Sequence, residues 1–492
     1  MKKLLTRLSW FVLLMFAILI ATLLIKTSLF SSKQIAISPI EPIVVETAAA
    51  ERLAAAVRIP TNSWTSSKID TPAFEAFLVF IEETFPLVDS LLERELVNDY
   101  SLLYHWPGAD QSLDPILLMG HYDVVPVEEA SLANWEQGPY SGLIADGMIW
   151  GRGTMDDKMA VIGILETTEG LLKEGFQPKR GLYFAFGHDE EVSGLRGADV
   201  MSKRLQAEEV KLAYILDEGG MTIADAMAGL SKPLSVVGVA EKGYLSLTLT
   251  ATIADGGHSS MPAKETAVSL LSKAIVRLSE NPLPARMDEM LSRQMFDYLG
   301  PEMDFATKMV FANRWLFGGV LEDQLSQDPK TNATIRTTTA PTMINGGVKD
   351  NVLPTEASAQ VNFRLMPGDD IKSVIAYVED IISDERVSVQ PYEGSIYSEA
   401  SPVSPTDAFG FKMIQQTIGE IMPASVVIPN LSVGATDARY YYPLSDQVYR
   451  YSPMFIESSD LKRMHGKDER LSVENYLRMV AFYDRLIRNS CE

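Results

Sequence analysis

The sequence predicts an α/β protein with a mainly parallel sheet, an inserted α+β domain and an N-terminal transmembrane helix. Three observations support this prediction. Apolar, strand-like runs alternate with helical patterns over residues 46–239, which is typical of layered α/β folds. Residues 240–396 instead contain strands of alternating polarity, each followed by a helical stretch, and α/β-like sequence resumes over 397–492. An uncharged apolar run spans Leu8–Ile25.

Composition and charge exclude several classes of protein. The chain has 492 residues with 65 acidic and 43 basic side chains, a net charge of −22, which speaks against a nucleic-acid-binding protein. Its length exceeds the roughly 250–300 residues that one hydrophobic core usually holds, so more than one domain is expected. Cys491 is the one cysteine, which excludes an intrachain disulfide and a cysteine-built metal site.

The N-terminal run predicts a membrane anchor. Lys2, Lys3 and Arg7 precede Leu8–Ile25, which is near the lower limit of roughly 17–25 residues for a spanning helix. The first small-residue candidate for signal cleavage, Ala48–Ala50, lies far downstream, so an uncleaved signal anchor is favoured over a removed signal peptide. The basic flank places the N-terminus in the cytoplasm and the rest of the chain in the periplasm, a vacuole lumen or the extracellular space. Residues 31–45 are expected to form a tether.

The main domain begins near Glu46 with elements that alternate between strand and helix. The predicted buried strands are 115–120, 181–187 and 211–216, and a helix is predicted over 160–172. In the insert, strands are predicted over 244–252 and 357–365, and helices over 266–278 and 371–382. Residues 281–339 are amphipathic and rich in methionine, and we interpret them as an extra helical piece of the insert. Their methionines favour core packing over the lining of an apolar substrate channel.

Acidic and histidine residues follow each of the three buried strands. The clusters are His121-Tyr-Asp123, His188-Asp189-Glu190-Glu191 and Asp217-Glu218, and a further acidic pair, Asp156-Asp157, ends a glycine-rich turn before a helix. A single acidic residue after a strand is often a helix cap or part of a solvated loop. Four clusters at equivalent positions instead predict a site beyond the carboxyl ends of the strands.

The residue types in these clusters indicate a hydrolytic metal site. Imidazole and carboxylate ligands without cysteine suit zinc, cobalt or manganese. A pair of ions needs five or more ligands, which His121, Asp156, Glu191, Asp217 and a late histidine supply if one carboxylate bridges both ions. Glu190 is the natural general base, and Asp123 is expected to orient His121 by accepting its free N–H.

Nine motifs then support a family resemblance. They are GHYDVVPV (120–127), WGRGTMDDK (150–158), GHDEEVSG (187–194), LDEGG (216–220), GGHSSMP (256–262), NVLP (351–354), NFRLMPGD (362–369), GATDARYY (434–441) and HGKDE (465–469). In this order they resemble the di-zinc aminoacylase and carboxypeptidase family, and within it the carboxypeptidase S-like branch of Gly-Xaa carboxypeptidases and N-acyl amino acid hydrolases.

The resemblance implies a ligand set. It places two Zn²⁺ per subunit, with Co²⁺ or Mn²⁺ as substitutes, on His121, Asp156, Glu191, Asp217 and His465, with Asp156 bridging and with Glu191 or Asp217 on either ion. Glu190 is the implied base.

The resemblance also implies substrate contacts and a partner. His258 helps to hold the oxyanion or a substrate carboxylate, often across a homodimer interface, and Arg364 pairs with a substrate carboxylate. Asn351 and the 434–437 loop, through Gly434 and Thr436, supply further contacts. The implied substrates are small peptides or N-acyl amino acids with a free carboxylate.

These implications give a domain division and leave alternatives. The division is a signal anchor (1–30), a tether (31–45), the catalytic domain (46–239 and 397–492) and an inserted lid and dimerisation domain (240–396). The alternative functions are a non-catalytic, membrane-anchored binding protein on the same fold and a different two-metal hydrolase such as a phosphoesterase. The weaker site candidates are expected to be structural: His188 buried near the site, His105 on the surface, Glu218 beside the ligand Asp217, and Arg152 paired with a carboxylate.

Overall fold

A mixed eight-stranded sheet forms the centre of the larger part of the molecule. The computed structural model describes residues 2–38, 40–41, 43–227, 229–287, 289–394 and 396–492. The strand order is β17 (Val426–Ser432), β10 (Leu234–Glu241), β18 (Val448–Ile456), β9 (Tyr214–Ile223), β5 (Ile116–His121), β8 (Leu182–Gly187), β4 (Ser101–Trp106) and β3 (Glu93–Val97).

The sheet is parallel at its centre and antiparallel toward its edges. Strands β18, β9, β5 and β8 run parallel to one another, as do β10 and β17. Strand β10 is antiparallel to β18, and β4 is antiparallel to both β8 and β3. The expected mainly parallel sheet is therefore correct for the strands that carry the acidic clusters, and the sheet as a whole is mixed.

Apolar side chains cover both faces of this sheet because successive residues of a strand point to opposite sides. On one face, Leu118 and Phe184 belong to a large core with helices α2 (Ala48–Val57), α3 (Thr71–Thr84), α4 (Pro86–Leu91), α5 (Lys158–Glu174), α13 (Phe409–Ile421) and α14 (Val473–Cys491). On the other, Leu117 and Met119 pack with α6 (Ala198–Ala207). The predicted strand 115–120 is thus buried on both sides, as its unbroken apolar sequence indicates.

The insert has a separate sheet and a separate core. Its antiparallel strands lie in the order β13 (Thr338–Gly346), β15 (Glu356–Leu365), β11 (Gly243–Thr252) and β16 (Val387–Pro391). Helices α7 (Ala267–Glu280) and α12 (Ile371–Ile382) share a core with β11 and β15. Both helices begin with a capping box, Thr266 with Ser269 and Asp370 with Ser373.

The helices between α7 and β13 pack differently from the prediction. Residues 281–339 contain α8 (Met290–Leu299), α9 (Phe305–Ala312), α10 (Arg314–Gln327) and α11 (Pro329–Ile335). Leu291, Phe296 and Phe311 join the core of the large sheet, not that of the insert, and Met303 is buried with them. The predicted helices are present, and Met303 packs in a core as expected. The helices belong to a different core from the predicted one, because the apolar face of α8 packs on β17.

Short strands and 3₁₀ helices complete the chain. The strands are β1 (Ser63–Thr65), β2 (Lys68–Ile69), β6 (Leu143–Ala145), β7 (Met148–Trp150), β12 (Gly257–His258), β14 (Val352–Leu353) and β19 (Arg470–Ser472). The 3₁₀ helices are η1 (Glu129–Asn134), η2 (Glu190–Val192), η3 (Gly300–Glu302), η4 (Asp437–Tyr440) and η5 (Ser458–Arg463).

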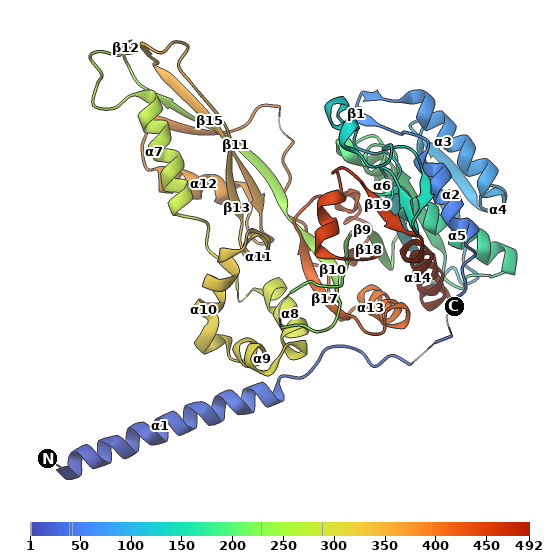
Figure 1. Cartoon of the computed structure of the whole chain (residues 1–492), viewed down its shortest axis with the longest axis horizontal. Helices are drawn as coiled ribbons and strands as arrows, with labels where there is room; N and C mark the ends of the chain where they lie inside the picture. Colours follow the sequence, from blue (N-terminus) through green and yellow to red (C-terminus); the bar gives the residue numbers. More distant parts are fainter. Residues whose placement is uncertain (1, 39, 42, 228, 288, 395) are drawn as a thin grey trace.

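Helix α1 (Lys2–Leu29) projects away from the rest of the molecule (Figure 1). It is long and apolar enough to cross a membrane, with a mean hydropathy of 2.7. The segment that follows is docked on the large domain. The side-chain amide of Gln34 pairs with both the N–H and the C=O of Val427, each at 2.9 Å, at the edge of the sheet. Within the segment 31–45, Gln34 is therefore held at the sheet edge by two hydrogen bonds.

Candidate metal centre

Five candidate ligand residues meet at the carboxyl ends of the central parallel strands. His121 is the last residue of β5, Glu191 lies in η2 just after β8, and Glu218 lies in β9. Asp156 comes from the turn before α5, and His465 from the loop between η5 and β19. Elements far apart in the sequence thus bring imidazoles and carboxylates to one edge of the sheet, as predicted from the clusters.

These side chains form two groups that share Asp156. In the first, His121 Nε2 lies 3.1 Å from Asp156 Oδ1 and 3.2 Å from Glu218 Oε1. In the second, His465 Nε2 lies 2.9 Å from Asp156 Oδ2 and 3.2 Å from Glu191 Oε2. In each group the ligand atoms lie within 4.8 Å of one another. Each group has the chemistry of a cation site, with Asp156 placed to bridge the two.

Strand β9 presents Glu218, not Asp217, to this centre. The carboxylate of Asp217 turns elsewhere and accepts the backbone N–H of Ala438 at 2.7 Å. The ligand predicted from the sequence is Asp217, with Glu218 beside it. Adjacent strand residues point to opposite sides, so one of the pair faces His121 and the other cannot. The irregular pairing of β9 with β18 after Asp217 leaves Glu218 on the side of His121.

Asp123 holds both the His121 ring and the Glu190–Glu191 backbone in place. Its Oδ1 lies 3.3 Å from His121 Nδ1, as expected for a carboxylate that orients the ring. The same carboxylate accepts the backbone N–H groups of Glu190 and Glu191, at 3.1 and 3.2 Å. Asp123 is buried and thereby fixes η2 relative to β5.

Glu469 is a second carboxylate that holds the site together, and it is not among the site residues predicted from the sequence. This buried carboxylate accepts the N–H groups of Gly153 and Met155, each at 2.9 Å, and pairs with the buried guanidinium of Arg152. The Arg152 prediction is correct. Because the glycine-rich turn carries Asp156 and Glu469 follows His465, this network holds the shared ligand and the late histidine in one unit.

Arg364 lies in β15, near the connection from β10 to β11. It is opposite Tyr244 in the β15–β11 pair, and its guanidinium lies 4.6 Å from the centre of the Tyr244 ring. None of the described residues forms an ion pair with it. Lys242, in the connection from β10 to β11, is buried and donates from Nζ to the carbonyl of Arg336 at 2.8 Å. Arg364 is thus a half-buried cation without a carboxylate partner among the described residues.

His258 and Asn351 lie together, far from the ligand groups. His258 pairs with Val352 across β12 and β14, and the carbonyl of Asn351 accepts the N–H of Ser259. Figure 1 shows β12 at the end of the insert away from the large sheet. The side-chain Oδ1 of Asn351 is buried and has no partner among the described residues. Within one chain, the structure does not bring these two residues to the metal centre.

The 434–437 loop follows β17 and is fixed by an ion pair. Thr436 is buried, and its hydroxyl lies 3.1 Å from Glu241 Oε2 and 3.2 Å from Arg450 Nε. Gly434 is exposed, and a side chain there would meet no atom within 4 Å. In this conformation, the hydroxyl of Thr436 therefore hydrogen-bonds to the Glu241–Arg450 ion pair, and Gly434 faces solvent.

The remaining histidines have structural surroundings. His188 is buried, its Nδ1 lies 2.6 Å from Ser101 Oγ, and its ring packs edge-on against Phe74. His105 lies in β4, within the antiparallel β3–β4 hairpin, and pairs with Glu93 at 2.7 Å.

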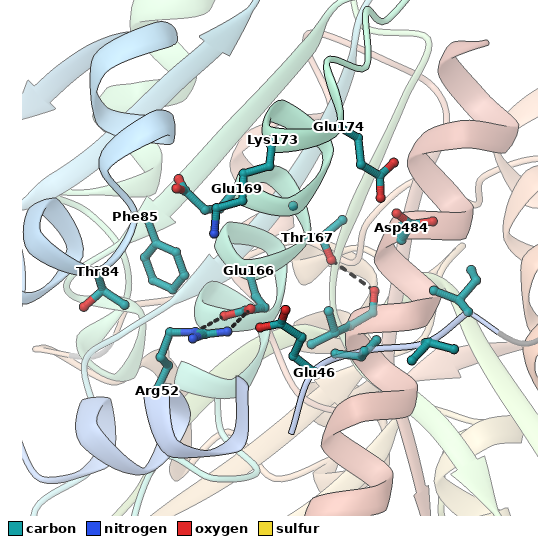
Figure 2. Close-up of a pocket in the computed structure, with 15 residues that line it drawn as sticks. Glu46, Arg52, Thr84, Phe85, Glu166, Thr167, Glu169, Lys173, Glu174 and Asp484 are labelled. Atoms are coloured by element: carbon teal, nitrogen blue, oxygen red, sulfur yellow. Dashed lines mark hydrogen bonds and ion pairs between the residues drawn. The ribbon is translucent and has the colours of Figure 1, made fainter. Parts of the chain in front are cut away.

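A separate pocket of about 260 Å³ lies behind the sheet, between residues 43–46 and helices α2, α5 and α14 (Figure 2). Two of its carboxylates have partners in the fold: Glu166 pairs with Arg52, and Glu169 accepts the N–H groups of Leu87 and Val88 at the start of α4. This pocket contains none of the predicted site residues.

Comparison with known proteins then assigns the family. The model of peptidase family M20/M25/M40 matches residues 117–489, which include every candidate metal ligand. The chain belongs to the M20 peptidase family. It is 42% identical over 480 residues to "probable carboxypeptidase S-like 2" of Dictyostelium discoideum, covering 95% of this chain and 91% of that protein. It is 40% identical over 482 residues to "N-fatty-acyl-amino acid synthase/hydrolase PM20D1" of Xenopus tropicalis, covering 96% and 93%.

The fold of solved M20 proteins agrees. The M20 family metallo-carboxypeptidase Sso-CP2 from Sulfolobus solfataricus superposes with a TM-score of 0.65 at 17% identity, covering 91% of this chain and 99% of that one. Family and fold together identify the chain as a hydrolytic enzyme.

M20 enzymes are generally zinc-dependent, and the residues of this chain fit such a group. Each cation position has one imidazole and two carboxylates, the nitrogen and oxygen donors that zinc takes in catalytic sites. Glu191 Oε1 is buried without a hydrogen-bond partner among the described residues, as expected of an oxygen aimed at a cation.

The electrostatics of the centre also favour bound cations. Burial opposes ionisation of Asp156, but hydrogen bonds from His121 and His465 outweigh it and lower the pKa of Asp156. The same contacts, from Asp156 and Glu191, raise the pKa of His465 to about 10. Burial, reinforced by the negative charge of Glu218, raises the pKa of Glu190 well above its ordinary value. Bound cations would offset this excess of buried negative charge.

Proposed function

We propose that this M20 enzyme hydrolyses the amide bond of N-acyl amino acids or dipeptides with a free carboxylate, using two zinc ions. The observation that carries the proposal is the pair of ligand groups on a shared Asp156, with Glu190 beside them. The ligands proposed for one ion are His121 and Glu218, and for the other Glu191 and His465.

The chain's own residues supply the remaining chemistry. When bound, two zinc ions lower the pKa of a water molecule and polarise the scissile carbonyl. Glu190 accepts the proton of the attacking water and passes it to the leaving amine, a role that suits a carboxyl group whose pKa burial raises. Asp123 positions Glu190 by accepting its backbone N–H, and it orients the ring of His121. Arg364, without a carboxylate partner among the described residues, binds the free carboxylate of the substrate.

Two relatives bear on the acyl group. The name of the Dictyostelium relative refers to a carboxypeptidase, and the name of the Xenopus relative to N-fatty-acyl amino acids. Peptides with a free C-terminus and N-acyl amino acids share an amide bond to an amino acid that keeps its carboxylate. We propose N-acyl amino acids first, because an apolar N-terminal helix suits an enzyme that meets amphiphilic substrates at a membrane.

We also propose that α1 is an uncleaved anchor and that the catalytic domain lies on the non-cytoplasmic side. The docked segment after α1 supports this proposal. Gln34 completes the edge of β17, and Ile37 lies so close to Gly419 that a side chain there would contact it at 2.6 Å. Cleavage near Ala48–Ala50 would remove both contacts.

The insert is proposed as the lid and the homodimer surface. Strand β13 is one of the two edge strands of its sheet and exposes Met343 and Ile344, which suits pairing with a second copy. His258 and Asn351, distant from the ligand groups of their own chain, would then reach the centre of the partner.

A substrate panel tests the central proposal. Zinc-loaded enzyme is assayed on N-acyl amino acids of increasing chain length, on Gly-Xaa dipeptides and on a phosphate monoester. The amides should be cleaved and the phosphate ester should not. Glu190→Gln should retain both zinc ions and lose about 100-fold or more of kcat. Cleavage of the ester, or a Glu190→Gln variant as active as the parent, would contradict the proposal.

A further inference from the structure

Helices α9 and α10 expose large apolar side chains next to α1. We define the α9–α10 surface by Phe305, Trp315, Leu316 and Val320, which are 63%, 56%, 43% and 67% exposed. Leu316 and Val320 occupy one side of the first two turns of α10, since residues four apart are neighbours on a helix surface, and Trp315 precedes them in the first turn. Exposed apolar residues are ordinary when scattered, whereas a clustered set of large ones indicates a contact surface.

The last turns of α1 pack on the same two helices. The side-chain amide of Asn313, between α9 and α10, lies 3.3 Å from both the carbonyl of Leu23 and the hydroxyl of Thr27. Lys26 Nζ lies 5.3 Å from the centre of the Trp315 ring. Figure 1 shows α9 beside the end of α1. The α9–α10 surface is therefore fixed at one level along α1.

That level is the boundary of a bilayer crossed by α1. The run Leu8–Ile25 is about 27 Å long at roughly 1.5 Å per residue, close to the roughly 30 Å of a hydrocarbon core. Lys26 follows the run directly and marks its outer end. A tryptophan stacked on this lysine is at the depth where membrane proteins concentrate tryptophan and basic residues.

The polarity of α10 changes along its length in the way that this position requires. Its first two turns expose Trp315, Leu316 and Val320, next to α1. Its next turns expose Asp323 and Gln324 on the same side of the helix. A helix whose first turns touch lipid and whose later turns rise into water needs this order, whereas an ordinary solvated helix needs no apolar beginning.

We propose that the α9–α10 surface is a second contact of this protein with the lipid bilayer, lying in the interface of the non-cytoplasmic leaflet. The proposal rests on α1 being a membrane anchor. The contact adds a second point of attachment, so that the large domain keeps one orientation on the bilayer and does not pivot about α1. It holds the hydrolytic domain close to a surface where amphiphilic acyl amino acids concentrate.

Fluorescent labels on α10 test this contact in the full-length chain. Val320→Cys and Gln324→Cys are labelled separately with an environment-sensitive fluorophore, and the native Cys491 is buried. Gln324 is the matched control because it is exposed one turn further along the same side. Each protein is reconstituted in phosphatidylcholine vesicles that carry a spin-labelled quencher near the headgroups. Leu316→Cys provides a second site on the apolar turns, and activity on a soluble dipeptide confirms folding.

The expected result is quenching by the lipid spin label at least about twofold greater at position 320 than at 324, with the opposite order for aqueous iodide. Equal quenching at the two positions would overturn the proposal. Protection of position 320 from both quenchers would also overturn it, because it would show that protein, such as a second copy, covers the surface. Flotation with the vesicles reports separately on α1: a chain that does not float refutes the anchor itself.

Discussion

Glu469→Gln is expected to weaken both the fold around the metal centre and its hold on metal. Glutamine keeps the shape of the side chain, and its oxygen still accepts the N–H groups of Gly153 and Met155. Its amide nitrogen then faces the guanidinium of Arg152, which is buried and loses its counter-charge. Removing one partner of a buried ion pair costs about 3–5 kcal/mol, because the other charge stays buried and unpaired.

The loss should reach the ligands because Glu469 joins the turn of Asp156 to the loop of His465. Residues that orient metal ligands typically contribute about 10–100-fold to metal affinity. Urea unfolding at fixed zinc concentration measures the change in stability, and dialysis against a graded chelator measures zinc retention. Glu174→Gln is the matched control, since Glu174 pairs with Arg488 at 2.6 Å but its side chain is 60% exposed, where a pair contributes about 0–1 kcal/mol. If Glu469→Gln costs no more than this control, the bracing role is refuted.

Three further predictions concern the metal ligands, His258 of the insert, and the buried Lys242. Glu218→Gln should lose one zinc ion per chain by elemental analysis whereas Asp217→Asn should retain both, and the reverse pattern would restore Asp217 as the ligand. Mixed dimers of His258→Ala and Glu190→Gln should recover activity that neither parent shows, because one of their two sites is intact; no recovery despite confirmed subunit exchange would place His258 outside the partner's site. Burial lowers the pKa of Lys242 from 10.5 to about 7, so the unfolded chain binds more protons than the folded protein between these values and stability rises with pH across that window. Lys242→Met should therefore raise the thermal midpoint more at about pH 6 than at about pH 9, and an equal shift at both would contradict the assignment.

Local sequence predicted most elements because their signals are local. The helix predicted over 371–382 is α12 with the same bounds, and the strand 244–252 lies within β11. Capping residues and periodic apolar positions act within a few residues, so they can be read without knowing the fold. The convergence of the acidic clusters was also predictable, since the carboxyl ends of parallel strands meet at one edge.

Tertiary structure decided which of two adjacent carboxylates faces the metal centre. Asp217 and Glu218 are chemically similar and adjacent, and the turn of β9 against β18 selects Glu218 for the centre. The amphipathic character of residues 281–339 was evident in the sequence, but an apolar stripe such as that of α8 does not say whether the insert or the large sheet will cover it.

The partners in contacts between distant segments could not be identified from the sequence for the same reason. Glu469 and Arg152 are 317 residues apart, and Gln34 meets Val427 across 393. Such contacts depend on the relative placement of whole elements, which is fixed by the summed packing of the core and by no single motif. The sequence alone thus determined the chemistry of the site and the anchor-like character of the N-terminus. The packed fold determined which side chains share that site, and it placed the exposed apolar turns of α10 beside α1.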